Sequence, residues 1–423
     1  MKKNLLLIIL IVFSGLATAF YRSREATILL FVISVIAAFN WNVRFKKDYF
    51  IACFVWLVYA LFISIKFDTI YPFFIFRHLA FITIAYVVIN IYRDSFFYKF
   101  ERIIYFFSLI SLFFYCWQTV APGSLIAIMK MADISQSPFS NRPDYYNFIF
   151  ITVDYYPDFL FQRNSGFCWE PGPFSIYVVF AMLFNLSRNN FNMMNNKTFW
   201  IFLVTLITTQ STTGLAAFIL MFLIIQFNKK LGAYKYVIFP VILIIVALIW
   251  VKVDILSSKV MELYIQSFEL EEIMMSSAER GAEHSAGRFG GFIIAWNDLI
   301  NNPLLGLGGN IEGSFGRQNY AQLYIVSGIG TIMSVYGLFG IVVYLYFTFR
   351  TSTFFSAYMN LKSKWLFFSM AFICSFAFSI QIQVILFTLL FFTLYNNRFQ
   401  YKTYVDFLNV YQKKPLKNIL KPQ

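Results

Sequence analysis

One segment of the chain combines the residue types that bind anions and move protons. Arg163 and Glu170 stand on either side of Gly166, and Pro171 follows the glutamate directly. A guanidinium group binds phosphate oxygens through two parallel hydrogen bonds, and a carboxylate can orient or deprotonate a hydroxyl. Because Pro171 and Pro173 suit the first turn of a helix, Glu170 is expected at a helix N-terminus. The alternative interpretation is a helix cap beside an interfacial anchor.

A second polar segment, Gln210-Ser211-Thr212-Thr213-Gly214, separates two short apolar runs. A tight turn between two short helices would lie below the outer membrane surface, where a lipid headgroup can meet hydroxyls and backbone amides. Ser211 and Thr212 are therefore candidate substrate-binding residues. An ordinary polar turn is the alternative interpretation.

A third cluster lies farther along the chain and holds Arg280, Glu283, His284 and Arg288. The two arginines are a little over two helical turns apart at about 3.6 residues per turn. On a helix they would point to the same broad side, where two guanidinium groups can clamp a pyrophosphate. Glu283 and His284 are candidate general bases between them. The alternative is a solvated, charged loop helix, in which an exposed histidine needs no function.

Arg77 and His78 stand inside a long apolar run, about one helical turn from its outer end. Ionisable groups at membrane depth are costly and are functional candidates, whereas snorkelling toward the interface is the structural alternative. The chain has only 2 histidines, and its 4 cysteines have no metal-ligand spacing. No nucleotide-binding motif is present. We therefore expect neither a metal nor another cofactor.

The elements that position these residues follow from composition. Apolar residues make up 59% of the chain and charged residues 13%, with a mean hydropathy of +0.66. A soluble domain is about half apolar and about a quarter charged, so this is predicted to be an integral membrane protein. Apolar runs that approach the roughly 20 residues of a span occur at 4–20, 26–40, 49–65, 72–92, 103–121, 171–187, 236–251 and 320–349. Two pairs of shorter runs lie at 198–210 with 214–228 and at 365–380 with 382–396.

Basic residues flank each short pair on both sides, which predicts that each pair goes out and comes back. The fold class is thus an all-α polytopic membrane protein with about twelve spans and both termini cytoplasmic. Its predicted cytoplasmic segments carry a net charge of +18 and its external segments −4. The excess basic charge is dispersed over short inner loops, which argues against nucleic acid as a partner. The expected parts are residues 1–121 with five spans, a periplasmic loop 122–170, central spans 171–251 including the hairpin 198–228, a second periplasmic loop 252–319, spans 320–396 and a cytoplasmic tail 397–423.

The order of these motifs resembles the O-antigen ligase/polymerase superfamily. The resemblance covers roughly residues 160–345. It rests on the R-x-x-G-x-x-x-E-P segment that begins at Arg163, the polar turn at 211–214, Arg288, Trp296, the stretch from Asn302 to Gly308, Asn319, and Tyr336-Gly337 with Gly340. Ligases of this superfamily carry a histidine just before the position of Asn319, and this chain has Gln318 there. The resemblance therefore implies a polymerase rather than a ligase.

Such a protein would be a GT-C-like glycosyltransferase of the bacterial inner membrane with its active site facing the periplasm. The resemblance implies that Arg163 and Arg288 contact the pyrophosphate of an undecaprenyl-linked glycan donor, and that a second lipid-linked glycan is the acceptor. Transfer would invert the configuration at the anomeric carbon and would need neither a metal nor a nucleotide. Glu170 is the first candidate base, with Glu283 or His284 second; Arg280, Arg77 and Asn319 complete the candidate binding residues. Membrane lipid and a chain-length regulator are the other expected partners. The rival from another class is a twelve-helix flippase or transporter.

Overall fold

The computed structural model describes residues 3–134, 145–155, 162–228, 287–319, 325, 327–361, 363–394 and 403–413. The first half of these residues forms helices α1 Lys3–Ser14, α2 Ala19–Arg22, α3 Arg24–Asn40, α4 Lys47–Phe67, α5 Pro72–Tyr92, α6 Ser95–Val120, α7 Pro122–Ala132, α8 Pro171–Arg188, α9 Lys197–Thr209 and α10 Thr212–Asn228. The second half forms α14 Gly287–Asn301, α15 Phe315–Asn319, α16 Gly328–Tyr358, α17 Leu366–Ala377, α18 Val384–Leu390 and α19 Tyr404–Lys413, with short 3₁₀ turns η2 Ile311–Gly313, η3 Ile380–Ile382 and η4 Phe392–Leu394.

Each expected apolar run that falls within the described residues contains a helix; the run 236–251 lies outside them. Helices α4, α5, α6 and α16 are long and apolar enough to cross a bilayer, and several shorter apolar helices accompany them. The chain is therefore a mostly helical, membrane-embedded protein, while the count of twelve passes stays a prediction. The first run is shorter than expected, because α1 ends at Ser14 and Leu16 has a positive φ of 52°.

Both short pairs fold back on themselves. In the second pair, the Ser327 hydroxyl at the start of α16 donates to the Phe376 carbonyl of α17, while Thr351, farther along α16, donates to the Leu390 carbonyl of α18. Helix α18 therefore returns along the path of α17. In the first pair, Gln210 has a φ of +49°, and the chain reverses there, because the Phe199 ring of α9 lies 6.5 Å from the Phe218 ring of α10. These reversals agree with the hairpins that the basic flanks predict.

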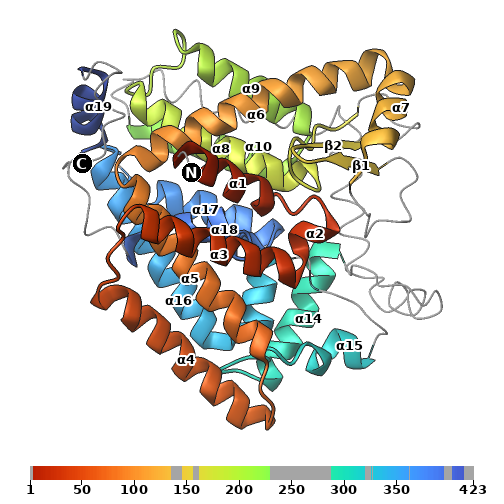
Figure 1. Cartoon of the computed structure of the whole chain (residues 1–423), viewed down its shortest axis with the longest axis vertical. Helices are drawn as coiled ribbons and strands as arrows, with labels where there is room; N and C mark the ends of the chain where they lie inside the picture. Colours follow the sequence, from red (N-terminus) through yellow and green to blue (C-terminus); the bar gives the residue numbers. More distant parts are fainter. Residues whose placement is uncertain are drawn as a thin grey trace.

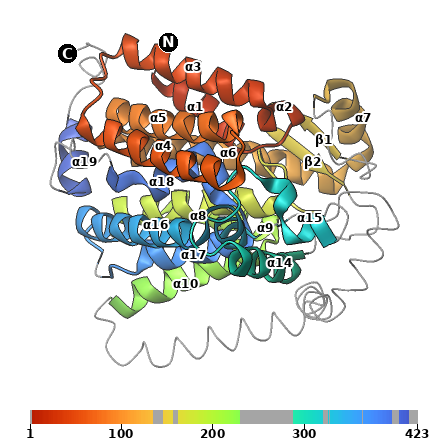
Figure 2. The same ribbon diagram turned by 90° about the horizontal axis from the view of Figure 1, so that it is seen from below.

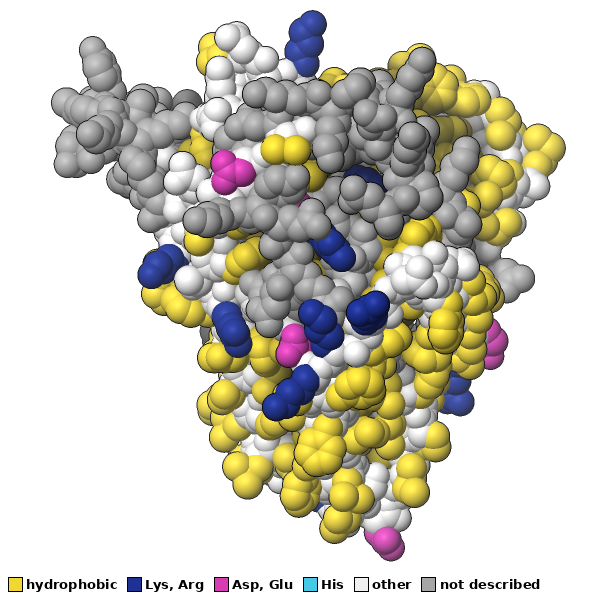
Figure 3. Space-filling view, turned by 60° about the vertical axis from the view of Figure 1, so that its left-hand side comes forward, with side chains coloured by type: hydrophobic (Ala, Val, Ile, Leu, Met, Phe, Trp, Pro, Cys, Tyr) yellow, Lys and Arg dark blue, Asp and Glu magenta, His cyan; other side chains and the backbone are white. Residues whose placement is uncertain are grey.

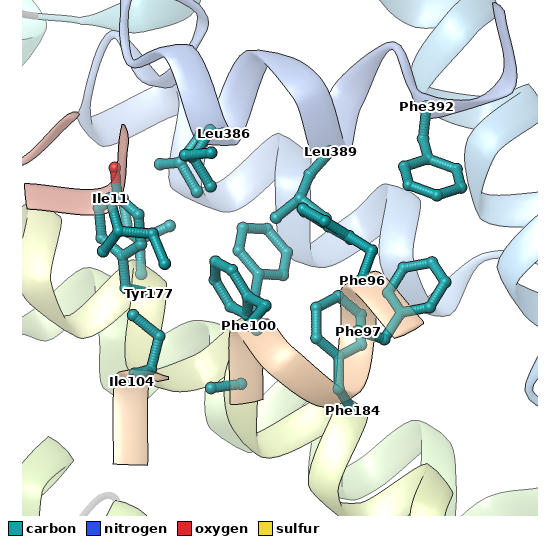
Figure 4. Packing of buried hydrophobic residues seen from close by; sticks show 14 of the residues in the cluster. Ile11, Phe96, Phe97, Phe100, Ile104, Tyr177, Phe184, Leu386, Leu389 and Phe392 are labelled. Carbon is teal, nitrogen blue, oxygen red and sulfur yellow. The ribbon is translucent and has the colours of Figure 1, made fainter. Parts of the chain in front are cut away.

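Helix α8 is the centre of the molecule. Every residue from Pro171 to Ser187 is buried, and the helix packs against α6, α9 and α10. A helix that is apolar on all sides belongs in a core. Figure 4 shows aromatic residues of α6 and α8 meeting side chains of α18. The Phe97 ring lies 4.9 Å from the Phe184 ring and 5.1 Å from the Phe392 ring, measured between centroids.

The predicted first periplasmic loop is folded rather than irregular. After α7, strands β1 Tyr145–Phe148 and β2 Ile151–Asp154 form an antiparallel hairpin, which the all-α expectation did not include. A small apolar cluster joins this hairpin to α7; its buried members are Leu125, Met129, Tyr146, Ile151 and Val153. The loop therefore has a core of its own beside the end of α6.

The two ends of the molecule differ. Helix α19 lies toward the left in Figures 1 and 2, whereas α2, α7, the β-hairpin, α14 and α15 lie toward the right. Turning the left-hand side forward brings a band of Lys and Arg side chains into view beside a largely apolar surface (Figure 3). Exposed basic residues of the predicted inner loops include Arg44, Lys46, Lys47, Arg93 and Arg102.

Candidate functional site

The segment 162–170 is held at the right-hand end by backbone hydrogen bonds to three other parts of the chain. The Asn164 amide donates to the Thr208 carbonyl over 3.0 Å, and the Thr152 amide donates to Gly166 over 2.7 Å. The Trp169 amide donates to Gly15 over 3.1 Å. Gly166 has a φ of +52°, and a Cβ there would lie 2.6 Å from the Phe174 ring. The glycine is therefore required by both the backbone conformation and the close packing on α8.

Glu170 occupies the N-cap position of α8, with extended backbone angles and Pro171 in the first helical turn. The expected placement at a helix N-terminus is thus observed. Its side chain is half-buried and makes no capping hydrogen bond, so the structure does not explain this glutamate as a helix cap. The positive end of the helix dipole favours a carboxylate at this position. Arg163 is also half-buried within the same segment.

The polar turn between α9 and α10 lies against this segment. The Gln210 side-chain amide donates to the Gln162 carbonyl over 3.0 Å. Ser211 is buried, and its hydroxyl accepts from Ser175 of α8 over 3.0 Å and from the Gly214 amide over 3.2 Å. Two motifs that are separate in sequence therefore meet at the N-terminus of α8. The Ser211 hydroxyl serves to cap α10 and join it to α8, while Thr212 is half-buried beside it.

The last part of the predicted second external loop reaches the same end of the bundle through α14. Arg288 stands in the first turn of α14, whose backbone is described there although that side chain is not. One turn later, the Phe292 ring lies 6.2 Å from Phe376 at the end of α17. Arg280, Glu283 and His284 lie outside the described residues. The backbone of Asn319 ends α15, and its side chain is likewise not described.

Phe378 joins the two sides of the site. A Cβ on Gly172 of α8 would lie 2.0 Å from the Phe378 ring, and a Cβ on Gly328 of α16 would lie 2.2 Å from its carbonyl oxygen. The Trp169 ring lies 6.4 Å from the Phe378 ring, measured between centroids. The Arg163–Glu170 segment, the start of α16 and the end of α17 are therefore neighbours. The α14 helix that carries Arg288 packs on this same group through Phe292.

Arg22 is a basic residue of the site that the sequence motifs did not reveal. Its guanidinium carbon lies 5.5 Å from the centre of the Trp169 ring, directly beside Glu170 in sequence, and its Nε donates to the Leu16 carbonyl over 2.8 Å. The side chain is exposed at the end of the short helix α2. None of the sequence motifs includes it.

The stretch from Asn302 to Gly308 has a clear structural role. Helix α16 is interrupted at Gly337, whose angles are φ 60° and ψ −153°. The amides of Leu338 and Phe339 donate to the carbonyls of Pro303 and Leu304, and in return the Leu307 and Gly308 amides donate to α16. This stretch therefore supplies the hydrogen bonds that the interrupted helix lacks.

Arg77 and His78 lie beside this interruption of α16, next to Tyr336. The His78 Nε2 is 2.5 Å from the Tyr336 hydroxyl, and the His78 ring stacks on Trp56 with centroids 4.1 Å apart. Arg77 acts electrostatically on the same Tyr336 hydroxyl. The pair is thus part of a polar cluster between α5 and α16. The contacts of His78 are to Tyr336 of α16 and Trp56 of α4, not to the Arg163–Glu170 segment.

Cys168 is the cysteine nearest the candidate site, and its environment suppresses its reactivity. Its side chain is 0% exposed. Burial raises the pKa of the Cys168 thiol well above its usual value, because an apolar environment disfavours the thiolate. A cysteine nucleophile at this position is therefore a poor explanation of the site.

No known protein-family model matches the chain, and no curated protein is significantly similar to it. The N-terminus of the buried helix α8 is surrounded by Arg163, Glu170, the exposed Arg22 and the polar turn at 211–214.

Proposed function

We propose that the protein is a membrane glycosyltransferase that polymerises lipid-linked oligosaccharide repeat units into O-antigen or a related surface polysaccharide at the periplasmic face of the bacterial inner membrane. The observation that carries this proposal is the convergence of the Arg163–Glu170 segment and the 211–214 turn at the N-terminus of α8. The helix that bears Arg288 packs at the same end.

The proposed chemistry divides between these residues. Arg163 and Arg288 balance the charge of the undecaprenyl pyrophosphate leaving group, which stabilises the transition state electrostatically. An acceptor hydroxyl attacks the anomeric carbon in line and inverts its configuration. Glu170 accepts the proton of that hydroxyl. Arg22, which lies over Trp169, adds positive charge beside the leaving group.

Two other functions remain as alternatives. A ligase would transfer the finished glycan to lipid A–core, and Gln318, in place of the histidine typical of ligases, disfavours it. A flippase or transporter is favoured by one observation, the interruption of α16, since transporters build their sites at broken helices near the midplane. In this chain the amides after the break are already bonded to Pro303 and Leu304, so they are not free to bind a substrate.

Deletion of the gene in its host separates the three functions. Loss of a polymerase leaves core carrying one repeat unit, loss of a ligase leaves bare core, and loss of a flippase accumulates repeat units on the inner face. Gel electrophoresis of the surface glycan distinguishes the first two, and labelling of lipid-linked units in sealed vesicles identifies the third. Only the single-repeat product supports the proposed polymerase.

Point variants then test the residues. We expect Arg163→Ala to lower polymer formation by about 10²-fold or more, the usual effect of removing one group that stabilises developing charge. Glu170→Gln keeps the shape of the side chain but cannot accept the proton, so it should be similarly inactive. Arg102→Ala is the matched control, because Arg102 is exposed on α6 in a predicted inner segment. Normal chain lengths in the Arg163→Ala strain, at normal protein level, would exclude the proposed pyrophosphate contact.

A further inference from the structure

The junction between α17 and α18 holds a buried amide with unused hydrogen-bonding capacity. Gln383 immediately precedes α18, and its side chain is 0% exposed. Neither its Nε2 nor its Oε1 has a hydrogen-bond partner among the described residues. Nearby, Gln381 donates from Nε2 to the Gly328 carbonyl over 3.1 Å, while its Oε1 likewise has no partner there. Buried polar groups are nearly always hydrogen-bonded, and leaving them unpaired destabilises a fold.

This junction borders the candidate site. Two residues after Gln383, the Ile385 amide donates to the hydroxyl of Ser14, the last residue of α1, and Gly15, which follows α1, accepts from the Trp169 amide. On its other side the junction begins at Phe378, which contacts the first turn of α8. The unpaired amide thus belongs to the same end of the bundle as Arg163 and Glu170.

The chemistry of an amide restricts what it can recognise. Nε2 donates hydrogen bonds and Oε1 accepts them, so a matching ligand offers both an acceptor and a donor. Pyrophosphate oxygens only accept and would leave Oε1 unpaired. A sugar offers both through neighbouring hydroxyls or through an acetamido group. Trp169, half-buried and near Phe378, supplies an aromatic surface of the kind that lines small-molecule sites.

We propose that Gln383 is a sugar-binding residue, which holds a saccharide unit of the lipid-linked glycan beside the N-terminus of α8. This inference rests on the proposed function for the identity of the glycan. It separates two roles within the site: the arginines bind the charged pyrophosphate, and the junction of α17 and α18 binds the neutral sugar. A buried water that bridges Gln383 to the protein is the competing explanation.

Gln383→Met tests the inference, because methionine nearly preserves the shape of glutamine and has no amide. Gln118→Met is the matched control: Gln118 is also buried, but its Nε2 donates to the Asp154 carbonyl over 3.2 Å. In the purified protein without ligand, we expect Gln383→Met to keep or raise the thermal unfolding midpoint, since it removes unpaired buried groups. Gln118→Met should lower it. A fall for Gln383→Met comparable to that of the control would show that the amide is satisfied within the fold and would overturn the inference.

The second measurement is binding of the oligosaccharide repeat unit, released from the host's own surface polysaccharide, to the purified protein. Wild type and Gln118→Met should bind alike, and Gln383→Met about tenfold more weakly or worse, the loss expected from about 1.4 kcal/mol. Absence of binding to wild type, or equal binding by Gln383→Met, would overturn the inference. A third outcome is that binding depends on Gln383 but deletion of the gene leaves polymerisation intact. That outcome would refute the polymerase function and retain the sugar site.

Discussion

A buried ion pair at the opposite end of α8 yields a quantitative prediction. The Glu101 carboxylate of α6 is 0% exposed, and Arg188 at the end of α8 is 17% exposed. Two parallel hydrogen bonds join them, at 2.6 Å from Nη2 and 3.0 Å from Nε, and Asn185 donates a third to the carboxylate over 2.8 Å. Arg188→Met would leave this carboxylate buried, with Asn185 as its one remaining hydrogen-bond partner among the described residues.

The size of the effect follows from burial. Breaking one side of a buried pair costs about 3–5 kcal/mol, because an uncompensated charge remains. With an unfolding entropy of about 2.1 cal/mol/K per residue and 423 residues, each kcal/mol lowers the midpoint by roughly 1.1 °C. The expected fall is therefore about 3–6 °C. Replacing both partners with methionine should recover most of it, since no buried charge is left.

Thermal unfolding of the purified protein in detergent measures these shifts. Arg317→Met is the matched control, because Arg317 and Glu312 form an ion pair of the same 2.6 Å length in which the glutamate is 80% exposed. Removal of an exposed pair costs about 0.2–1 kcal/mol, which corresponds to about 1 °C or less. Equal effects of Arg188→Met and Arg317→Met, or a double variant as unstable as Arg188→Met, would refute the argument from burial.

Three further predictions concern the site and its supports. Gly337→Ala should destabilise the protein by about 1–3 kcal/mol, since the backbone angles of Gly337 are strained for any residue with a side chain. Gly123→Ala is the control and should be neutral or stabilising in the same thermal assay, because Gly123 is a helical glycine with open space around it. Ser211→Ala should cost about 0.5–2 kcal/mol through loss of the α10 cap, and retention of the full wild-type midpoint would contradict that role. Cys168 should resist maleimide at about pH 8, because its raised pKa keeps the thiol protonated; mass spectrometry should find it labelled only after unfolding in detergent, while exposed Cys116 is the native-state control.

The sequence was informative wherever local pattern decides structure. Apolar runs marked the helices, and Pro171 with Pro173 correctly placed the start of α8. Basic flanks correctly indicated that the short pair around Gln210 reverses direction. These features depend on composition and on backbone preferences within a few residues, so they can be seen without knowledge of the fold.

Features that depend on distant partners were not predictable in this way. Glu101 and Arg188 are 87 positions apart in sequence, and nothing local pairs them. Arg22 lies against Trp169, which is far away in the sequence. Gln383 stands near the start of an apolar run, and its sequence neighbours do not indicate that its buried amide has no hydrogen-bond partner among the described residues. The hydrogen bonds that the 303–308 stretch gives to α16 likewise exist only in three dimensions.

The complete enclosure of α8 has a consequence for how the protein is made. This helix carries Ser175, Asn185 and Ser187 within its buried length. Within the part of the chain that the structure describes, four helices are long and apolar enough to cross a bilayer by themselves, and α8 is not one of them. A segment that never faces lipid is free to hold such polar groups, but it enters the bilayer poorly alone. Its insertion during synthesis should therefore depend on α6, which emerges first. Glu101 of α6 is then already in place to pair with Arg188 of α8. During assembly of the membrane domain, neighbouring helices would then stabilise α8 in the bilayer, which it enters poorly alone.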